Sequence, residues 1–306
     1  MNHKAKAHIA VLLANFFFGT AVVAVKHITP SLMQPLALNF MRICGALILF
    51  WVLFAFNPSK PSIEKKDAPL FLICAISGVV INQILFVKGT SLTSPIHASL
   101  LSLATPIAIT LISLFFLKEK PGVLKYTGLF LGISGAALLI VFRNMDTDKS
   151  SSLTGDTFVL LNATSYASYL ILVKPLMEKY APTHVIRWVF LFGAVFIIPL
   201  GWNDFNHINW ASFNWTHWLS LGFIVIGATF FAYLFIVYGI AHLGSSVVGS
   251  YIYTQPFFAT ISAIILFNEH LNLIKIIAAC LIFSGVYLVN RKKKLSVPEG
   301  LESIDG

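Results

Sequence analysis

Apolar stretches of roughly 20 residues recur along the whole chain, separated by shorter segments that hold most of the charged residues. A helix of that length crosses the ~30 Å hydrocarbon core of a bilayer. The predicted spans are residues 8–28, 35–56, 68–87, 95–117, 123–142, 156–174, 183–201, 215–238, 245–267 and 272–290. The pattern therefore predicts an all-α integral membrane protein with ten transmembrane helices.

The composition supports the bilayer as the solvent of this chain. Of its 306 residues, 57% are hydrophobic and 11% are charged, and the mean hydropathy is +0.83. Soluble domains carry about 25% charged residues, so this chain has too few to cover a water-facing surface. The net charge of +9 lies in short segments between apolar stretches and forms no basic face for a nucleic acid. The three cysteines form no CxxC pair, so we expect no metal site and no cofactor.

The basic residues predict the orientation of the spans. With a cytoplasmic N-terminus, fifteen of the 21 Lys and Arg residues fall in cytoplasmic segments and five in outer segments, while Arg42 lies within a span. Cytoplasmic loops carry the excess of positive charge, so both termini are expected to be cytoplasmic. The first apolar stretch is longer than a signal-peptide core and no A-x-A site closes it, so we expect it to be retained as a span. The expected location is the cell membrane, specifically a bacterial inner membrane.

The chain resembles itself at an offset of 150 residues. The matched pairs are Gly89 and Gly239, Pro106 and Pro256, Glu119 and Glu269, Lys125 and Lys275, Ser134 and Ser284, and Gly135 and Gly285. Each copy has five predicted spans, an odd number, so the second copy enters the membrane from the opposite side. The predicted organisation is a first repeat (1–142), a linker loop (143–155), a second repeat (156–290) and a cytoplasmic tail (291–306).

Two inverted five-helix repeats are the recurrent build of secondary transporters. Equivalent halves exchange conformations, so a single site between them opens to each side of the membrane in turn. The alternative is a duplicated membrane protein without transport activity. The repeat favours the transporter.

Two stretches also resemble a known family. They begin VKGTSLTSPIHASLLSLATP in 87–140 and VYGIAHLGSSVVGSYIYTQP in 237–289. Both have a Gly before a small-residue turn, a Pro inside the next span, a Glu closing that span and a Gly in the last span. Over residues 8–290 the chain resembles the EamA-like family of the drug/metabolite transporter superfamily. The resemblance implies ten spans around a central cavity, and a cargo such as an amino acid, another metabolite or a drug.

Polar side chains inside a membrane are costly and usually face a cavity or a partner helix. The predicted substrate-binding residues lie in the spans that the resemblance places around the cavity: Asn15, Asn82, Gln83, Thr105, Asn162, Tyr166, Tyr233, Tyr253 and Gln255. Thr105 and Gln255 are the preferred pair because they precede prolines at equivalent positions. The amides either face the cavity or bond between helices, and the tyrosines either contact an aromatic cargo or pack.

Pro106 and Pro256 are predicted hinge or gate residues. A proline inside a helix frees a carbonyl one turn earlier, and in a membrane that carbonyl needs protein or water beside it. The alternative is a simple packing kink. Ser99 and Ser102 share a helix face with Pro106, but single serines often bond to their own helix, so they rank below the residues above.

Arg42 either binds a carboxylate of the substrate, or extends to the outer interface, or bonds to helix carbonyls. All twelve acidic residues lie outside the central parts of the spans. Coupling to protons or sodium commonly uses an intramembrane carboxylate, so we expect a facilitator or exchanger. His97 is the nearest titratable substitute. Glu119 and Glu269, which close equivalent spans, are expected to anchor loops or contribute to a gate.

The expected function is secondary transport of a small organic solute, an amino acid or another metabolite, by alternating access, with export as the expected direction. A broad-specificity drug exporter is the first alternative. An intramembrane enzyme is a remote alternative, because His97, His184 and His242 lie near span ends without carboxylate neighbours in the spans and no HExxH or GxSxG motif is present. The expected partners are the solute and membrane lipid. Gly128-x-x-x-Gly132 allows close helix approach, which we expect within a monomer, with a homodimer as the alternative.

Overall fold

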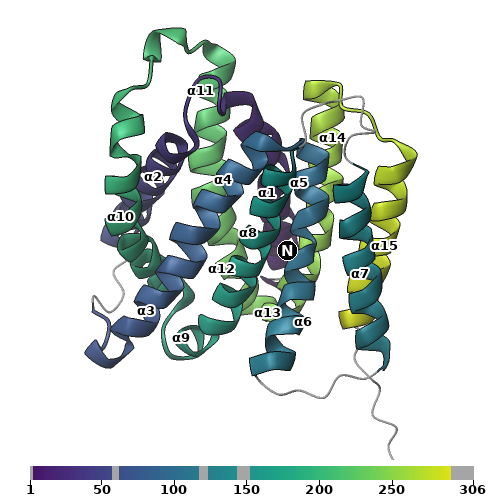
Figure 1. Ribbon diagram of the computed structural model, residues 1–306. Helices are drawn as coiled ribbons and strands as arrows, with labels where there is room; N and C mark the ends of the chain where they lie inside the picture. Colours follow the sequence, from purple (N-terminus) through teal and green to yellow (C-terminus); the bar gives the residue numbers. More distant parts are fainter. Residues whose placement is uncertain (1–2, 57–61, 117–122, 143–151, 291–306) are drawn as a thin grey trace, which may run out of the picture.

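The computed structural model describes residues 3–56, 62–116, 123–142 and 152–290 (Figure 1). Its α-helices are α1 (His3–Ile28), α2 (Pro35–Phe56), α3 (Ala68–Ala75), α4 (Asn82–Leu92), α5 (Pro95–Ser102), α6 (Ala104–Phe116), α7 (Val123–Val141), α8 (Leu153–Leu172), α9 (Lys174–Lys179), α10 (Pro182–Asn206), α11 (Trp215–Gly222), α12 (Ala232–Leu243), α13 (Ser245–Ser250), α14 (Gln255–Phe267) and α15 (Leu273–Asn290). No strand occurs in these residues.

The helices account for the predicted spans. In the described part of the chain, nine helical segments are long and apolar enough to cross a membrane, and a tenth apolar segment, Leu273–Val289, is shorter. The third and eighth spans each contain a π-helical segment between two helices. A π-helical segment, Ile76–Ile81, joins α3 to α4, and another, Phe223–Phe231, joins α11 to α12. The expectation of an all-α membrane protein with two repeats is confirmed.

The first helices of the two halves run in opposite directions. Lys26, near the end of α1, donates from Nζ to the carbonyl oxygen of Ser91 at the end of α4, 2.9 Å away. The Ser152 amide, at the start of α8, donates to the carbonyl oxygen of Leu92 over 3.1 Å. Hence α1 ends on the side of the bundle where α8 begins. We call this side the α11 end and the opposite side, which carries α9 and α13, the α9 end (Figure 1).

The two halves interlock rather than sit side by side. Helix α1 packs most extensively against α12 and α14 of the second half, and α8 packs against α4 and α6 of the first. The second spans, α2 and α10, pack together, and so do the last spans, α7 and α15. Each half therefore buries much of its apolar surface on the other, with an approximate twofold relation between them.

Small residues bring α7 and α15 into close contact. A Cβ atom added to Gly128 would lie 2.6 Å from the carbonyl oxygen of Gly285, and one added to Gly285 would lie 2.5 Å from the backbone nitrogen of Gly132. Neither distance admits a real side chain, so these helices meet backbone to backbone, as small-residue motifs allow. The Gly128-x-x-x-Gly132 motif thus packs within the monomer, and a homodimer stays a prediction.

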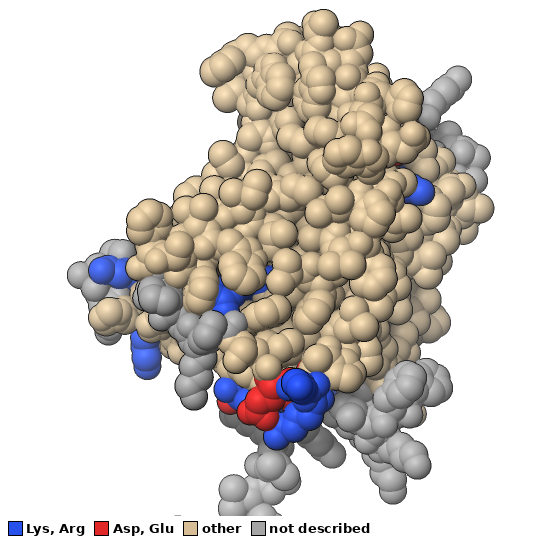
Figure 2. Space-filling model, turned by 90° about the vertical axis from the view of Figure 1, so that its left-hand side faces the viewer, with Lys and Arg blue, Asp and Glu red and all other residues tan. Residues whose placement is uncertain are grey.

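The outer surface has the character of a lipid-facing one. On the face shown in Figure 2, the charged side chains gather toward the α9 end and the broad surface above carries almost none. Large apolar side chains are exposed there and elsewhere on the bundle; Ile48 is 63% exposed and Leu200 is 52% exposed. Exposed apolar surface on this scale is out of place in water, whereas a helix whose backbone is internally bonded presents it to lipid without penalty.

Five residues at the α9 end form a connected polar group, the α9-end cluster, which consists of Glu64, Lys66, Asp67, Lys179 and Tyr180. The Glu64 carboxylate lies 3.0 Å from Lys66 Nζ and 2.7 Å from Lys179 Nζ. Asp67 pairs with Lys179 and accepts a hydrogen bond of 2.6 Å from the Tyr180 hydroxyl. These contacts tie the segment before α3 to the end of α9.

Candidate functional site

A cavity lies between the two halves. It holds about 780 Å³ of space between atoms, part of it continuous with the surroundings. Helices α1, α2, α4, α5 and α6 line it from the first half, and α8, α12 and the start of α14 line it from the second. The predicted binding residues that line it are Asn82, Gln83, Thr105, Asn162, Tyr166, Tyr233 and Gln255. Their role in binding stays a prediction, but the structure brings them together.

The third span of each half carries its π-helical segment immediately before its cavity residues. A π turn contains one extra residue and so shifts which side chains face inward, and such turns are frequent at functional sites. Gln83 follows the first segment and Tyr233 follows the second. Gln83 Nε2 donates to the Tyr233 hydroxyl over 3.1 Å. The two residues are 150 positions apart, the repeat offset, so equivalent positions of the two halves meet inside the cavity.

Two amides of the wall bond to a neighbouring helix, and the amide behind them also bonds within its own helix. Gln255 Nε2 donates to Asn15 Oδ1 over 2.8 Å, and Asn15 Nδ2 donates to the carbonyl oxygen of Val11 over 2.8 Å. Asn162 Nδ2 donates to the carbonyl oxygen of Asn82, also over 2.8 Å. Asn15 is fully buried and lies behind Gln255 rather than in the lining, so it orients the wall.

Tyr253 is the other predicted residue that does not line the cavity. It lies in the 3₁₀ turn Tyr251–Thr254 and packs on the apolar cluster around Val22 and Ile96. Of the alternatives for the tyrosines, the geometry of Tyr253 is that of packing.

The fourth and ninth spans are broken just before their prolines. Helix α5 ends and α6 begins two residues later, ahead of Pro106. Helix α13 gives way to the 3₁₀ turn Tyr251–Thr254 before α14 starts ahead of Pro256. Each proline therefore lies in the first turn of a new helix, where its missing N–H costs little. The hinge role stays a prediction, now based on the helix breaks.

The hydroxyls near these breaks bond to their own helices. The carbonyl oxygen of Ser102, one turn before Pro106, accepts from Thr105 Oγ1 over 2.8 Å, so the expected free carbonyl is wrong at this position. Ser99 and Ser102 donate to carbonyls of α5 over 2.8 and 2.7 Å. This is the self-bonding that small hydroxylated residues favour in helices, and it explains why these side chains line the cavity without bonding across it.

Arg42 lies in the cavity wall. Only 3% of it is exposed, so the alternative in which it extends to the outer interface is wrong. Its Nε donates to Thr229 Oγ1 over 3.1 Å, and that hydroxyl donates to the carbonyl oxygen of Ile224 over 2.7 Å. The guanidinium carbon lies 5.7 Å from the centre of the Phe86 ring. Thr229 was missed in the sequence because nothing in the pattern shows that the π-helical segment turns it toward α2.

The cavity continues toward the α9 end. Phe18, Tyr166 and Tyr233 line both the central cavity and a second hollow that extends to Lys174 and Glu178. The side chains of Lys174 and Glu178 are exposed. The hollow space between the halves thus approaches the surface at this end of the bundle.

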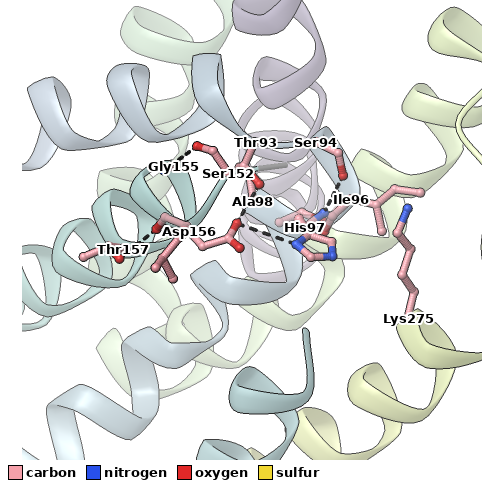
Figure 3. Close-up of polar contacts among 12 residues, drawn as sticks. Thr93, Ser94, Ile96, His97, Ala98, Ser152, Gly155, Asp156, Thr157 and Lys275 are labelled. Carbon is pink, nitrogen blue, oxygen red and sulfur yellow. Dashed lines mark hydrogen bonds and ion pairs between the residues drawn. The ribbon is translucent and has the colours of Figure 1, made fainter. Parts of the chain in front are cut away.

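At the α11 end, buried polar side chains join the halves (Figure 3). Asp156, in the first turn of α8, is fully buried. Its Oδ1 accepts from Thr93 Oγ1 over 2.6 Å and lies 3.6 Å from His97 Nδ1. The expectation that His97 has no carboxylate neighbour is therefore wrong. The Ser152 side chain, which accepts from the Gly155 amide, caps α8, so the helix begins three residues before Asp156, the first residue of the predicted span.

Glu269 makes the second connection at this end. It is 3% exposed, and its Oε1 accepts from Ser94 Oγ over 2.6 Å and from Lys275 Nζ over 3.1 Å. Its Oε2 accepts from the Ile96 amide over 3.3 Å. These contacts fit a loop anchor or gate contact, while Glu119, its equivalent in the first repeat, lies outside the described residues. We call the residues of the two connections the α11-end cluster: Thr93, Ser94, His97, Asp156, Glu269 and Lys275.

The chain is similar to proteins of known family. An uncharacterized transporter of Archaeoglobus fulgidus is 24% identical over 290 residues, covering 94% of this chain and 98% of that protein. The uncharacterized transporter YetK of Bacillus subtilis is 21% identical over 289 residues, covering 94% of this chain and 88% of that protein. A protein of known crystal structure has a TM-score of 0.62 at 16% identity, covering 94% of this chain and 97% of its own, and so shows the same fold.

The family model covers both halves of the molecule. It describes the EamA-like transporter family and matches residues 5–141 and 153–291. The two matches correspond to the two interlocked halves that enclose the cavity. The chain therefore belongs to the EamA-like transporter family, a family of multi-pass membrane transporters.

Proposed function

We propose that this protein is a secondary transporter that moves a small organic solute across the cell membrane by alternating access. The observation that carries the proposal is the asymmetry of the space between the halves. Seven predicted binding residues line one cavity, which continues toward the α9 end, while buried polar contacts join the helices at the α11 end. The structure has the form expected of one of two alternating states.

The contacts that Asp156 and Glu269 make with α5 and the turn before it cross from one half to the other. Thr93, Ser94 and His97 belong to the first half, whereas Asp156 and Glu269 belong to the second. Rocking of the halves that opened this end would separate those pairs. The cluster is thus the closed gate of this state, and its contacts are the ones that must be exchanged for others during transport.

The proposed orientation places the α9 end in the cytoplasm, because the segments that hold most of the Lys and Arg residues lie on that side. This state then accepts its solute from the cytoplasm, as the first step of export requires. A broad-specificity drug exporter would use the same geometry with a less selective wall. No carboxylate belongs to the cavity lining in the described residues, which supports a facilitator or exchanger.

Side-specific labelling tests alternating access. In a chain whose natural cysteines, Cys44, Cys74 and Cys280, are replaced, Ser102→Cys places one thiol in the cavity wall. A membrane-impermeant maleimide is added to one face of sealed, oriented vesicles. We expect labelling of Ser102→Cys from the α9 side, and labelling from the α11 side that rises when Ser94→Ala weakens the gate.

Two exposed positions control for orientation in the same background. Lys174→Cys should react only from the α9 side and Thr154→Cys only from the α11 side, since both side chains are exposed. Labelling of Ser102→Cys from the α11 side that stays absent even after long exposure would overturn the proposal, because a site that never opens to that side cannot alternate. If Ser94→Ala does not raise the labelling of Ser102→Cys from the α11 side, the α11-end cluster is not the gate.

A further inference from the structure

The wall of the central cavity contains one cation with no counter-charge. Arg42 is 3% exposed and lines the cavity. None of the ion pairs among the described residues involves Arg42, and the lining contains no Asp or Glu. Another buried cation of the spans, Lys275, differs in this respect because it pairs with Glu269. The central cavity thus carries a net positive charge.

The guanidinium is fixed along one edge and has unused donors on the other. Arginine has five N–H donors in a planar fork. Nε is bonded to Thr229 Oγ1, whereas Nη1 is buried and has no hydrogen-bond partner in the described part of the chain. The Thr229 hydroxyl gives its own proton to the Ile224 carbonyl, so its lone pair is what holds Arg42. This arrangement orients the fork before any ligand binds.

An unpaired buried cation is costly, and a ligand anion relieves that cost. Burial of a charge is tolerated when the charge is paired and hydrogen-bonded, and an intramembrane charge is by default a functional one. A carboxylate matches the guanidinium fork with two parallel hydrogen bonds. A doubly charged phosphate fits less well, since the described part of the lining supplies only this one positive charge.

The rest of the wall indicates the body of the ligand. Phe18, Phe86, Tyr166 and Tyr233 line the cavity, and aromatic side chains favour apolar or aromatic groups. Gln83 and Tyr233 already bond to each other. The amide side chains of the wall are uncharged, so they select among neutral polar groups of the ligand. Among the lining residues that the structure describes, no anionic side chain is present to receive an ammonium group.

We propose that Arg42 is an anion-binding subsite, and that the solute is an organic monocarboxylate with an apolar or aromatic body whose carboxylate binds the Arg42 guanidinium. This inference rests on the proposed function, because it names the class of solute for the same cavity. Thr229 acts as a positioning residue that orients the guanidinium.

The test compares three probes with the same aromatic body: 3-phenylpropionate, its neutral amide 3-phenylpropionamide, and the cationic 3-phenylpropylamine. Binding is measured on purified full-length protein from the rise in melting temperature, which increases with ligand concentration. We expect the carboxylate to stabilise the protein and the amide and amine to have little effect. Arg42→Gln should weaken carboxylate binding by about 10- to 100-fold, the usual worth of hydrogen bonds to a charged group.

Arg187→Gln is the matched control. Arg187 is also 3% exposed, but it stacks on Phe54, 3.6 Å from the ring centre, in a separate hollow. This variant should bind the carboxylate as the wild type does. Thr229→Val should weaken binding by a smaller factor, and Thr229→Ser, which keeps the hydroxyl, should restore it.

Three outcomes would overturn the subsite. The first is stabilisation of the wild type by the amide equal to that by the carboxylate. The second is an unchanged carboxylate preference in Arg42→Gln, and the third is no stabilisation by the carboxylate even at about 10 mM, where weak binding still registers. Binding in detergent does not require alternating access. If the carboxylate binds through Arg42 but the labelling test fails, the proposal of alternating access is overturned and the anion-binding subsite stands. If the labelling test succeeds but the carboxylate does not bind through Arg42, the subsite is overturned and the proposal of alternating access stands.

Discussion

The two ends of the bundle both hold carboxylates beside lysines, and in both the contacts join one half to the other, but they differ in burial. At the α11 end, Asp156 and Glu269 are 0% and 3% exposed. At the α9 end, the side chains of Glu64 and Asp67 are 52% and 18% exposed. Water and salt screen exposed ion pairs, whereas a buried carboxylate that loses its partner stays unpaired at low dielectric. The closed end is thus held by contacts that resist separation, and the end that the cavity approaches is held by contacts that yield easily.

The largest effect is expected from breaking the pair of Glu269 and Lys275. Lys275→Met leaves the Glu269 carboxylate buried without its cation, and removal of one partner of a buried pair costs about 3–5 kcal/mol. Thermal unfolding in detergent should show a clear fall in melting temperature. The matched control is the double variant Glu269→Gln/Lys275→Met, which removes both charges and should recover most of the loss. A double variant as unstable as Lys275→Met would contradict this account.

A smaller effect is expected at Asp156. Asp156→Ala removes the acceptor of the Thr93 hydroxyl, and a buried donor left unsatisfied costs about 1–3 kcal/mol. Asp156→Asn keeps an oxygen in that place and should be less destabilising. The two variants are compared by the same unfolding measurement. If the two variants are equally unstable, the stabilisation by Asp156 comes from its proximity to His97 rather than from the Thr93 hydrogen bond.

At the α9 end the equivalent change should have almost no effect. Lys179→Ala removes the cation shared by Glu64 and Asp67, but both carboxylates reach water and need no other partner. Its melting temperature and its labelling pattern in vesicles should match those of the wild type. Destabilisation comparable to that of Lys275→Met would abolish the distinction between the ends.

The smallest effect is a dependence on pH at Glu64. Hydrogen bonds from Lys179 and Lys66 hold the pKa of the Glu64 carboxyl below its usual value of 4.5. A lowered pKa in the folded state means that the contribution of Glu64 to stability is present above pH 4.5 and is lost as the pH falls through the folded pKa. The small difference in melting temperature between the wild type and Glu64→Gln should therefore shrink in acid. If this difference in melting temperature grows as the pH falls, hydrogen bonds from Lys179 and Lys66 do not explain the contribution of Glu64.

The sequence predicted the inverted repeat and most of the cavity wall because both follow from simple regularities. An odd number of spans per copy fixes the inversion, and the 150-residue offset relates Gln83 to Tyr233, which meet in the structure. Three features were out of reach. Thr229 approaches Arg42 only through a π-helical segment, and Asp156 is buried only because α8 begins before it. Asn15 looked like a cavity residue because polarity alone does not tell whether an amide faces the space or the helix behind it.

The exchange of packing partners between the halves also bears on how the chain is assembled. Helix α1 is synthesised first, yet the helices that cover it, α12 and α14, belong to the second half. Asn15 in α1 is therefore synthesised before Gln255, its hydrogen-bond partner in the folded protein. An intramembrane amide without a partner is unfavourable. A five-span fragment expressed alone lacks the helices of the other half on which its own helices pack. The two fragments expressed together supply the helices of both halves.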